Sequence, residues 1–148
     1  MLENKVALVT GAAKGIGRAI ALRLAEDKAT VIVNYNGSKE RAEEVVKMIT
    51  DMGGRAESYQ CNVADDEACQ AMLRDIIKKY GHLDILVNCA GVQRRHFCTE
   101  FPLSDWDDVI EVNLTATFEM CQLAANQMIA QNSKGKIINV ASMLSYFG

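Results

Sequence analysis

The chain has 148 residues, of which 49% are hydrophobic and 24% are charged, and its formal net charge is −3. This composition is that of one globular domain with its own core, and the small negative charge implies no general affinity for nucleic acid. No apolar run is long enough to span a membrane, and the amino terminus lacks the apolar core of a signal peptide. The five cysteines lack the spacing of a metal site. We therefore expect reduced thiols, no bound metal and a cytoplasmic protein.

The first predicted element is a strand at residues 6–9, which a glycine-rich turn joins to a helix. The run Val-Ala-Leu-Val is typical of a strand buried on both faces, and Ile16, Ile20 and Leu24 recur at helical spacing. Gly11 is the first of three glycines in the order Gly-x-x-x-Gly-x-Gly, which leave room for a tight turn or a close ligand. A helix that begins there directs free N–H groups and its positive end above the strand, which suits a phosphate. A purely structural turn is the alternative, and the motif is not a P-loop.

Further strand and helix patterns alternate along the chain. Buried apolar runs predict strands at 29–33 and 83–87, and further strands are predicted at 56–61 and 136–141. Lys28 stands where the first helix would usually end in glycine, Ser38 can cap a second helix, and Asp65 or Asp66 can start a third that Gly81 closes. Ser104 is expected to cap one long helix that runs through Met128.

Strands separated by helices predict an α/β fold with a doubly wound parallel sheet. In such sheets ligands bind beyond the carboxyl ends of the strands, where the strand order reverses. Gly11, Asn88 and Ser142 follow the first, fourth and fifth predicted strands, so the pattern places them along one rim.

Four segments together resemble motifs of the short-chain dehydrogenase/reductases. Residues 10–17, Thr-Gly-Ala-Ala-Lys-Gly-Ile-Gly, resemble the nucleotide-binding motif, and residues 88–91, Asn-Cys-Ala-Gly, are similar to an Asn-Asn-Ala-Gly motif. Asn113 and Ser142 stand where the family keeps two catalytic residues. The resemblance covers the whole chain and implies an oxidoreductase that moves a hydride between a nicotinamide cofactor and a carbonyl or secondary alcohol. It also implies a Rossmann-like domain over 1–148, truncated after the fifth strand.

The resemblance assigns roles to individual residues. Ser142 would bond the substrate carbonyl, and Asn113 would hold a water in a proton relay. The cofactor would lie on the glycine turn and on the ends of three strands, at Gly11, Lys14, Gly15, Ile16, Gly17, Asn36, Asn62, Val63, Asn88, Ala90 and Gly91. Two positions depart from the family, because Asn62 replaces a common aspartate beside the adenine and Cys89 replaces an asparagine.

The cofactor is expected to be NADP(H), with NAD(H) possible. An acid about 20 residues beyond the glycine turn normally binds the ribose of NAD, and the window 34–38 contains none. Lys14 lies in the turn, where NADP-dependent members often carry a basic residue. The alternative for Lys14 is a solvated loop charge.

The substrate is expected to be a small sugar acid such as gluconate. Arg94 and Arg95 suit a carboxylate, and with residues 105–106 and 141–145 they resemble gluconate 5-dehydrogenases and 2-deoxy-D-gluconate 3-dehydrogenases. The first half resembles the 3-oxoacyl-carrier-protein reductases as closely, which is the alternative substrate class. The two arginines could also be a solvated loop pair.

The family's proton donor, the tyrosine of a Tyr-x-x-x-Lys pair, is expected beyond Gly148. Tyr35 and Lys39 have this spacing but occur at a strand end, which we interpret as coincidence. We therefore expect no turnover from these 148 residues alone, association through the apolar strand at 136–141, and a homo-oligomer at full length. A non-catalytic nucleotide-binding module is the competing hypothesis, which the sequence past Gly148 would decide.

Overall fold

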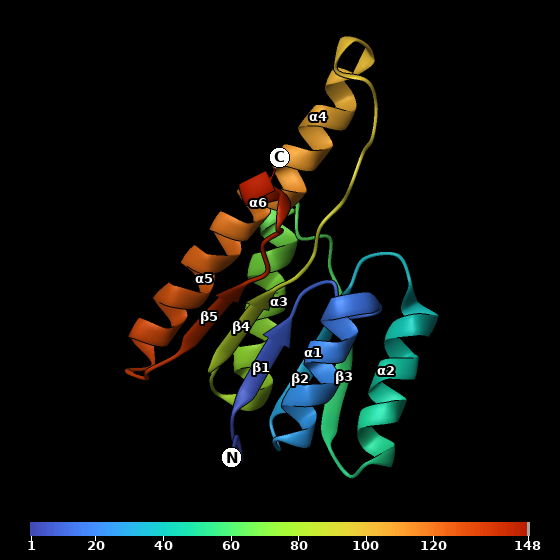
Figure 1. Ribbon diagram of the computed structural model, residues 1–148. Coiled ribbons are helices and arrows are strands. Elements are labelled where there is room, and N and C mark those ends of the chain that lie inside the picture. The colour runs from blue at the N-terminus through green and yellow to red at the C-terminus, as the bar shows by residue number, and fades with distance from the viewer. Residues whose placement is uncertain (148) are drawn as a thin grey trace.

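Five parallel strands form one sheet in a computed structural model that describes residues 1–147 (Figure 1). The strands are β1 (Val6–Val9), β2 (Thr30–Tyr35), β3 (Arg55–Gln60), β4 (Ile85–Asn88) and β5 (Lys136–Asn139). Their order is β3-β2-β1-β4-β5, so the strand order reverses between β1 and β4. The predicted α/β fold with a doubly wound parallel sheet is confirmed.

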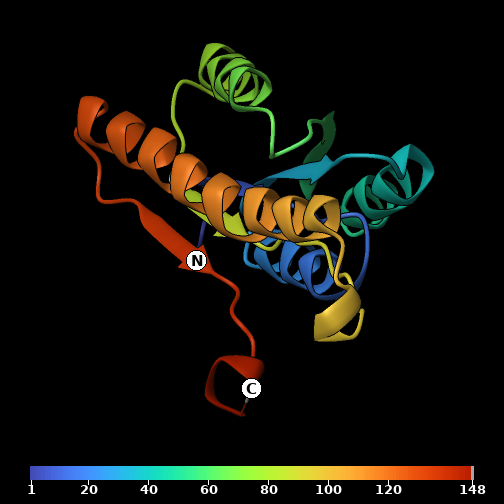
Figure 2. The same ribbon diagram turned by 90° about the horizontal axis from the view of Figure 1, so that it is seen from above.

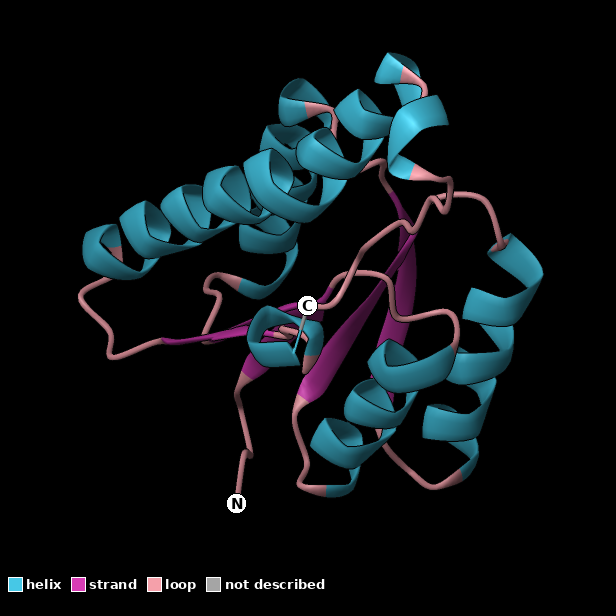
Figure 3. Ribbon diagram, turned by 45° about the horizontal axis from the view of Figure 1, so that its top comes forward, coloured by secondary structure: helices cyan, strands magenta, loops and turns pink. Residues whose placement is uncertain are grey.

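Helices lie on both faces of the sheet (Figure 3). They are α1 (Gly15–Glu26), α2 (Lys39–Asp51), α3 (Asp66–Tyr80), η1 (Cys98–Glu100), α4 (Leu103–Ile110), η2 (Glu111–Thr115), α5 (Ala116–Ala130) and α6 (Leu144–Phe147). Strand residues alternate between the faces: Leu8 packs in the core beneath α3 and α5, whereas Ala7 and Val9 pack in the core beneath α1 and α2.

Helix α1 packs on the sheet through small residues together with the predicted Ile20 and Leu24, whereas the third predicted residue, Ile16, does not take part. Gly17, Ala21 and Ala25 are its buried residues, whereas Ile16 is 64% exposed. Small side chains allow the helix to approach the sheet closely. Ile16 is thereby left at the surface of the glycine turn.

Most predicted helix ends are confirmed by their geometry. The Asp65 carboxylate accepts from the N–H of Ala68 at 3.0 Å, and Gly81 ends α3 at φ +84°. Ser38 occupies the N-cap position of α2 as predicted, but its side chain makes no capping hydrogen bond. Lys28 takes φ +77° just after α1, a left-handed conformation that favours glycine.

The long helix predicted from Ser104 to Met128 is present as one continuous helical run over residues 103–130, although its N-cap and its interior differ from the prediction. Helix α4 already begins at Leu103 with Pro102 as its N-cap, and η2 is a π-helical segment that separates α4 from α5. Such segments insert one residue into the helical ladder, and apolar periodicity does not reveal them.

Strand β5 lies at one edge of the sheet, and α6 projects from it (Figure 2). Ile137 is 37% exposed and Ile138 49% exposed, as expected for an apolar edge strand. Asp84 connects this edge to the middle of the sheet, because its carboxylate accepts from the N–H of Val6 at 2.9 Å and its carbonyl from that of Lys136 at 2.8 Å. Burial raises the pKa of the Asp84 carboxyl, but bonds from Val6, His82 and Lys5 outweigh burial and lower it. Among residues 1–147, no helix is both long enough and apolar enough to cross a bilayer.

Candidate functional site

The glycine turn lies where the strand order reverses, at the carboxyl ends of β1 and β4. Gly11 takes φ +61°, and a Cβ added there would stand 2.7 Å from the Cα of Ala90. A Cβ on Gly17 would overlap the carbonyl oxygen of Gly11 and stand 2.9 Å from its carbon. Both positions therefore require glycine because backbones meet there. Gly15 also has a positive φ of +56°, but the described space around its missing Cβ is open.

Thr10 joins the two strands beneath this turn. Its hydroxyl accepts from the N–H groups of Cys89 and Ala90, both at 3.1 Å, and donates to the carbonyl of Val87 at 3.4 Å. Thr10 is 1% exposed. The hydroxyl therefore fixes the residue 88–91 turn against the glycine turn.

Asn34 fixes the other side of the glycine turn. Its amide oxygen accepts from the N–H of Gly11 at 3.2 Å, and its amide nitrogen donates to the carbonyl of Cys61 at 3.1 Å. The sequence analysis did not single out Thr10 or Asn34. The available signal was a buried polar side chain near the carboxyl end of a predicted strand.

The start of α1 gives this rim its positive potential. The N–H of Arg18 bonds the carbonyl of Lys14 at 3.2 Å, so the helix begins at Gly15 and directs its first N–H groups outward. Lys14 is exposed beside them. The geometry suits an anion above Gly11.

Asn36 follows β2 on the same rim. Its carbonyl accepts from the Gln60 amide at 3.1 Å, and the next residues, 37–41, line a hollow of about 380 Å³. Lys39 and Arg41 line this hollow together with Glu40. The two cations strengthen the case for a 2′-phosphate here, and the sequence analysis did not assign them.

Asn62 and Val63 follow β3. The Asn62 amide oxygen accepts from the N–H of Ala64 at 3.0 Å, which forms an Asx turn and leaves the residue exposed. Val63 is 7% exposed and packs in the core with Cys61 and Cys69. Of the two, only Asn62 presents its side chain to the surface of the rim.

Asn88 connects β4 to β5 rather than capping a turn. Its amide donates to the Asn139 oxygen at 2.9 Å and contacts the Cys121 sulfur at 3.3 Å. Cys89 follows it, and burial raises the pKa of this thiol, which keeps it protonated near neutral pH.

Asn113 belongs to the π-helical segment, and its side chain bonds both backbone polar groups of Val92. Its side chain accepts from the N–H of Val92 at 2.8 Å and donates to the carbonyl of Val92 at 2.9 Å. A Cβ on Gly91 would stand 3.2 Å from the Asn113 oxygen. Asn113 therefore holds the start of the 92–102 loop against the junction of α4 and α5.

Ser142 lies between β5 and the short helix α6, two residues before that helix starts. Its Oγ accepts from the N–H of Leu144 at 3.2 Å, and its carbonyl accepts from the N–H of Ser145 at 3.0 Å. The side chain is exposed. It follows the fifth strand of the same rim, as predicted, and in this structure it forms a local turn.

Arg94 is already bound to carboxylates of α4. Its guanidinium lies 3.3 Å from Asp108 and 3.8 Å from Asp105. Arg95 is held less tightly than Arg94. When the Gln93 amide oxygen faces Arg95, it accepts an N–H···O bond of 3.1 Å from the guanidinium. The structure therefore does not bring the two arginines together as one carboxylate site.

An apolar cavity of about 510 Å³ opens beside Asn113, between the 92–102 loop and α4. The side chains that give it its apolar character include Val92, Phe101, Trp106, Val109 and Ile110. It lies beyond the carboxyl end of β4, where a substrate would meet the cofactor rim. The sequence analysis did not identify this cavity.

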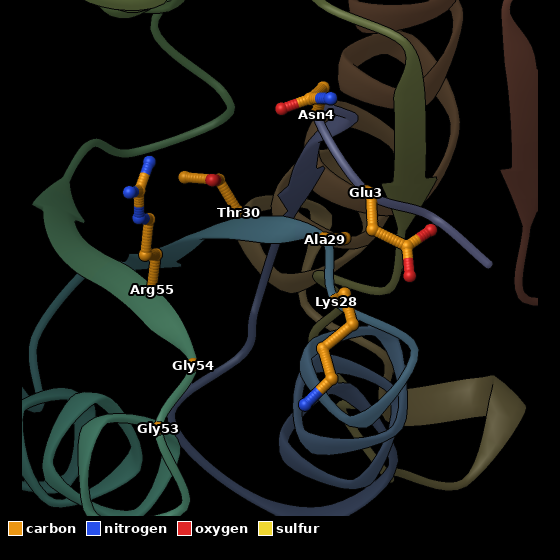
Figure 4. A pocket seen from close by; sticks show the side chains of 8 residues that line it. All are labelled: Glu3, Asn4, Lys28, Ala29, Thr30, Gly53, Gly54 and Arg55. Carbon is orange, nitrogen blue, oxygen red and sulfur yellow. The ribbon is translucent and has the colours of Figure 1, made fainter.

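A second hollow lies at the opposite end of the sheet (Figure 4). Residues just before β1 and around the starts of β2 and β3 line it, among them Asn4, Lys28 and Arg55. Lys28 and Arg55 extend away from each other. Because doubly wound sheets bind ligands at the carboxyl ends of their strands, this hollow is not the candidate site.

The parallel sheet, the glycine turn at the reversal of strand order and the helix that starts above it define a dinucleotide-binding α/β protein. The chain belongs to the short-chain dehydrogenase family, whose model matches residues 5–148. The family resemblance inferred from the four motifs is thereby confirmed.

Curated relatives match nearly the whole chain. A 3-oxoacyl-[acyl-carrier-protein] reductase of Staphylococcus aureus is 46% identical over 148 residues, which are 100% of this chain and 60% of the relative. Glucose 1-dehydrogenase 2 of Bacillus subtilis is 39% identical over 143 residues, 96% of this chain and 55% of the relative. The chain thus spans about 60% of the length of the reductase it matches.

Solved structures of the same family superpose closely. A Burkholderia cenocepacia short chain dehydrogenase in complex with NADP has a TM-score of 0.90 and 39% identity, over 97% of this chain and 58% of that one. A metagenomic short-chain oxidoreductase in complex with NADP has a TM-score of 0.90 and 36% identity, over 96% of this chain and 64% of that one. The cofactor predicted from the sequence is the one present in both complexes.

Proposed function

We propose that the protein binds NADP(H) on the rim formed by the ends of β1 to β4 and is an oxidoreductase of carbonyl or secondary-alcohol substrates. The observation that carries the proposal is the glycine turn. A side chain at Gly11 or Gly17 would collide with the backbone there, and helix α1, which starts in the turn, directs free N–H groups outward. A pyrophosphate fits such a turn. When bound, the cofactor supplies or accepts the hydride.

The chain's own residues would position and polarise the substrate. The Ser142 hydroxyl would donate its O–H to the substrate oxygen while its Oγ accepts from the Leu144 N–H, since a hydroxyl can do both at once. Asn113 would fix the loop that separates the rim from the apolar cavity, through its two bonds to Val92. In the family, the asparagine at this position holds a water in a proton relay. Asn113, which lies in the π-helical segment, would have the same role.

The preference for NADP(H) over NAD(H) gives a direct test. We expect NADP(H) to bind at least about tenfold more tightly, because Lys14, Lys39 and Arg41 lie on the rim and no acid occurs at 34–38. Asn36→Asp should reverse this order, since a carboxylate there binds the ribose hydroxyls and repels a 2′-phosphate. Fluorescence titration of both cofactors measures the effect.

Asn132→Asp is the matched control for this test, because it adds the same charge in the loop before β5, outside the candidate rim. It should leave the ratio of the two dissociation constants unchanged. Equal binding of the two cofactors by the unaltered protein would contradict the proposed preference.

For the substrate, we propose a 3-oxoacyl thioester as the class that the site fits best. The cavity beside Asn113 is lined mainly by apolar side chains, and Arg94, which also lines it, is bonded to Asp105 and Asp108. The names of the staphylococcal relatives support the same class. A sugar acid is the second candidate, because Arg95 lies outside the carboxylate cluster that holds Arg94.

Chain length of the acyl group should change the rate of reduction. We expect kcat/KM to rise about fourfold for each methylene that enters the cavity, the equivalent of ~0.8 kcal/mol. Val109→Ser should flatten this rise, since Val109 lines the cavity. NADPH oxidation with a series of 3-oxoacyl thioesters measures it.

Leu103→Ser is the control, because Leu103 is 73% exposed and lies outside the cavity lining of the same helix. It should keep the dependence on chain length. Faster oxidation of gluconate-type acids than reduction of any thioester, with a KM that Arg95→Ala raises for the acid alone, would favour the sugar-acid candidate and overturn the thioester assignment.

A further inference from the structure

Two buried thiols lie in contact beneath the adenine side of the rim. Cys61 directly follows β3, and Cys69 lies in the first turns of α3. Their sulfur atoms are 3.8 Å apart, and the residues are 2% and 1% exposed. The Cys69 sulfur also contacts the carbonyl of Val63 at 3.5 Å. The two cysteines therefore lie on either side of the short connection from β3 to α3, residues 62–65.

The contact makes the two thiols chemically unequal. The two sulfurs share one S–H···S contact in which either can donate, and this contact lowers the pKa of Cys61 despite its burial and raises that of Cys69. A thiolate is the nucleophile in thiol oxidation, and a neighbouring thiol resolves the oxidised form. The arrangement therefore places a resolving thiol beside Cys61, and a peroxide reaches the pair when the segment around Cys61 opens.

We propose that Cys61 and Cys69 form a modification site, at which a hydroperoxide oxidises them to a reversible disulfide. The Cys61 thiolate attacks the peroxide oxygen, the O–O bond breaks, and a sulfenic acid forms with release of an alcohol or water. The Cys69 sulfur then attacks the Cys61 sulfur, the S–O bond breaks, and water leaves with the Cys69 proton. Two thiols are oxidised and one peroxide is reduced.

The cross-link requires movement in the rim. A disulfide has a sulfur separation of about 2.05 Å, so the start of α3 and the end of β3 must approach each other. The carbonyl of Cys61 is bonded to the Asn34 amide, whose oxygen holds the N–H of Gly11. A shift of Cys61 is therefore transmitted to the glycine turn.

Oxidation should consequently weaken cofactor binding. This consequence rests on the proposed function, whereas the formation of the cross-link does not. We expect the dissociation constant for NADP(H) to rise at least about fivefold, the lower end of the usual coupling between sites. Dithiothreitol should restore the original value.

The experiment treats the purified protein with hydrogen peroxide, blocks free thiols with N-ethylmaleimide and maps the cysteines by peptide mass spectrometry. The expected product is a peptide pair joined through Cys61 and Cys69. It should form while the circular dichroism spectrum is still that of the folded protein. Cys98→Ser is the matched control, because Cys98 is exposed and lies far along the chain. It should form the same cross-link, whereas Cys69→Ala should not.

NADP(H) titration of the oxidised and reduced samples completes the test. A mapped cross-link with unchanged affinity would overturn the coupling to the cofactor rim. Oxidation of other cysteines before this pair, or a pair that links only after unfolding, would overturn the site itself. Because the map is read from the unaltered protein, neither result depends on how the variants fold or on turnover.

Discussion

Gly17→Ala should weaken NADP(H) binding at least about tenfold and lower the free energy of unfolding by about 1–3 kcal/mol. The added Cβ would overlap the carbonyl of Gly11, and the backbone there cannot yield without opening the turn. Gly17 is buried in the helix that directs its N–H groups at the proposed pyrophosphate. Cofactor titration and urea unfolding of the variant measure the two losses.

Two other glycines on the same rim provide the controls. Gly37→Ala should leave the free energy of unfolding within about 0.5 kcal/mol, because no described atom lies within 4 Å of the added Cβ. Gly15→Ala should cost about 1–2 kcal/mol from its positive φ alone, without a steric overlap. If Gly17→Ala bound the cofactor as tightly as the unaltered protein, the turn could not be the pyrophosphate site.

The sheet was predictable because each strand has a recognisable pattern in its own short stretch of sequence. Five strand-like segments separated by helices are enough to identify parallel strands, and the first was placed at its observed bounds, Val6–Val9. The boundaries of the other strands differ by at most two residues, in part because β2 and β4 continue into the polar Asn34 and Asn88. Polar residues at the carboxyl end of a strand carry the site, so apolar runs stop short of them.

The candidate site was predictable only where a motif identifies a backbone requirement. Gly11 and Gly17 are examples, because tight turns and close approach restrict the residue type. The sequence did not reveal that the Thr10 hydroxyl bonds three backbone groups, because these partners lie 77 to 80 residues away along the chain. The pairing of Arg94 with Asp108 was missed because the π-helical segment and the loop geometry are set by tertiary packing.

Thr10→Val should lower the free energy of unfolding by about 2–4 kcal/mol, although the two side chains have nearly the same shape. The substitution leaves the N–H groups of Cys89 and Ala90 buried near an apolar methyl group, and each unpaired donor costs about 1–3 kcal/mol. The residue 88–91 turn would then move away from Gly11. We therefore also expect NADP(H) affinity to fall, as measured by titration beside the urea unfolding curve.

Thr10→Ser separates the hydrogen bonds from the shape of the side chain. Serine keeps the hydroxyl that both N–H groups need and loses only one buried methyl group, so it should cost about 1 kcal/mol and bind the cofactor nearly normally. Equal losses in the serine and valine variants would mean that packing of the methyl group, and not the two accepted hydrogen bonds, joins β1 to the turn after β4. A larger loss in valine, matched by a weaker cofactor complex, would show that the Thr10 hydroxyl holds the two halves of the rim together.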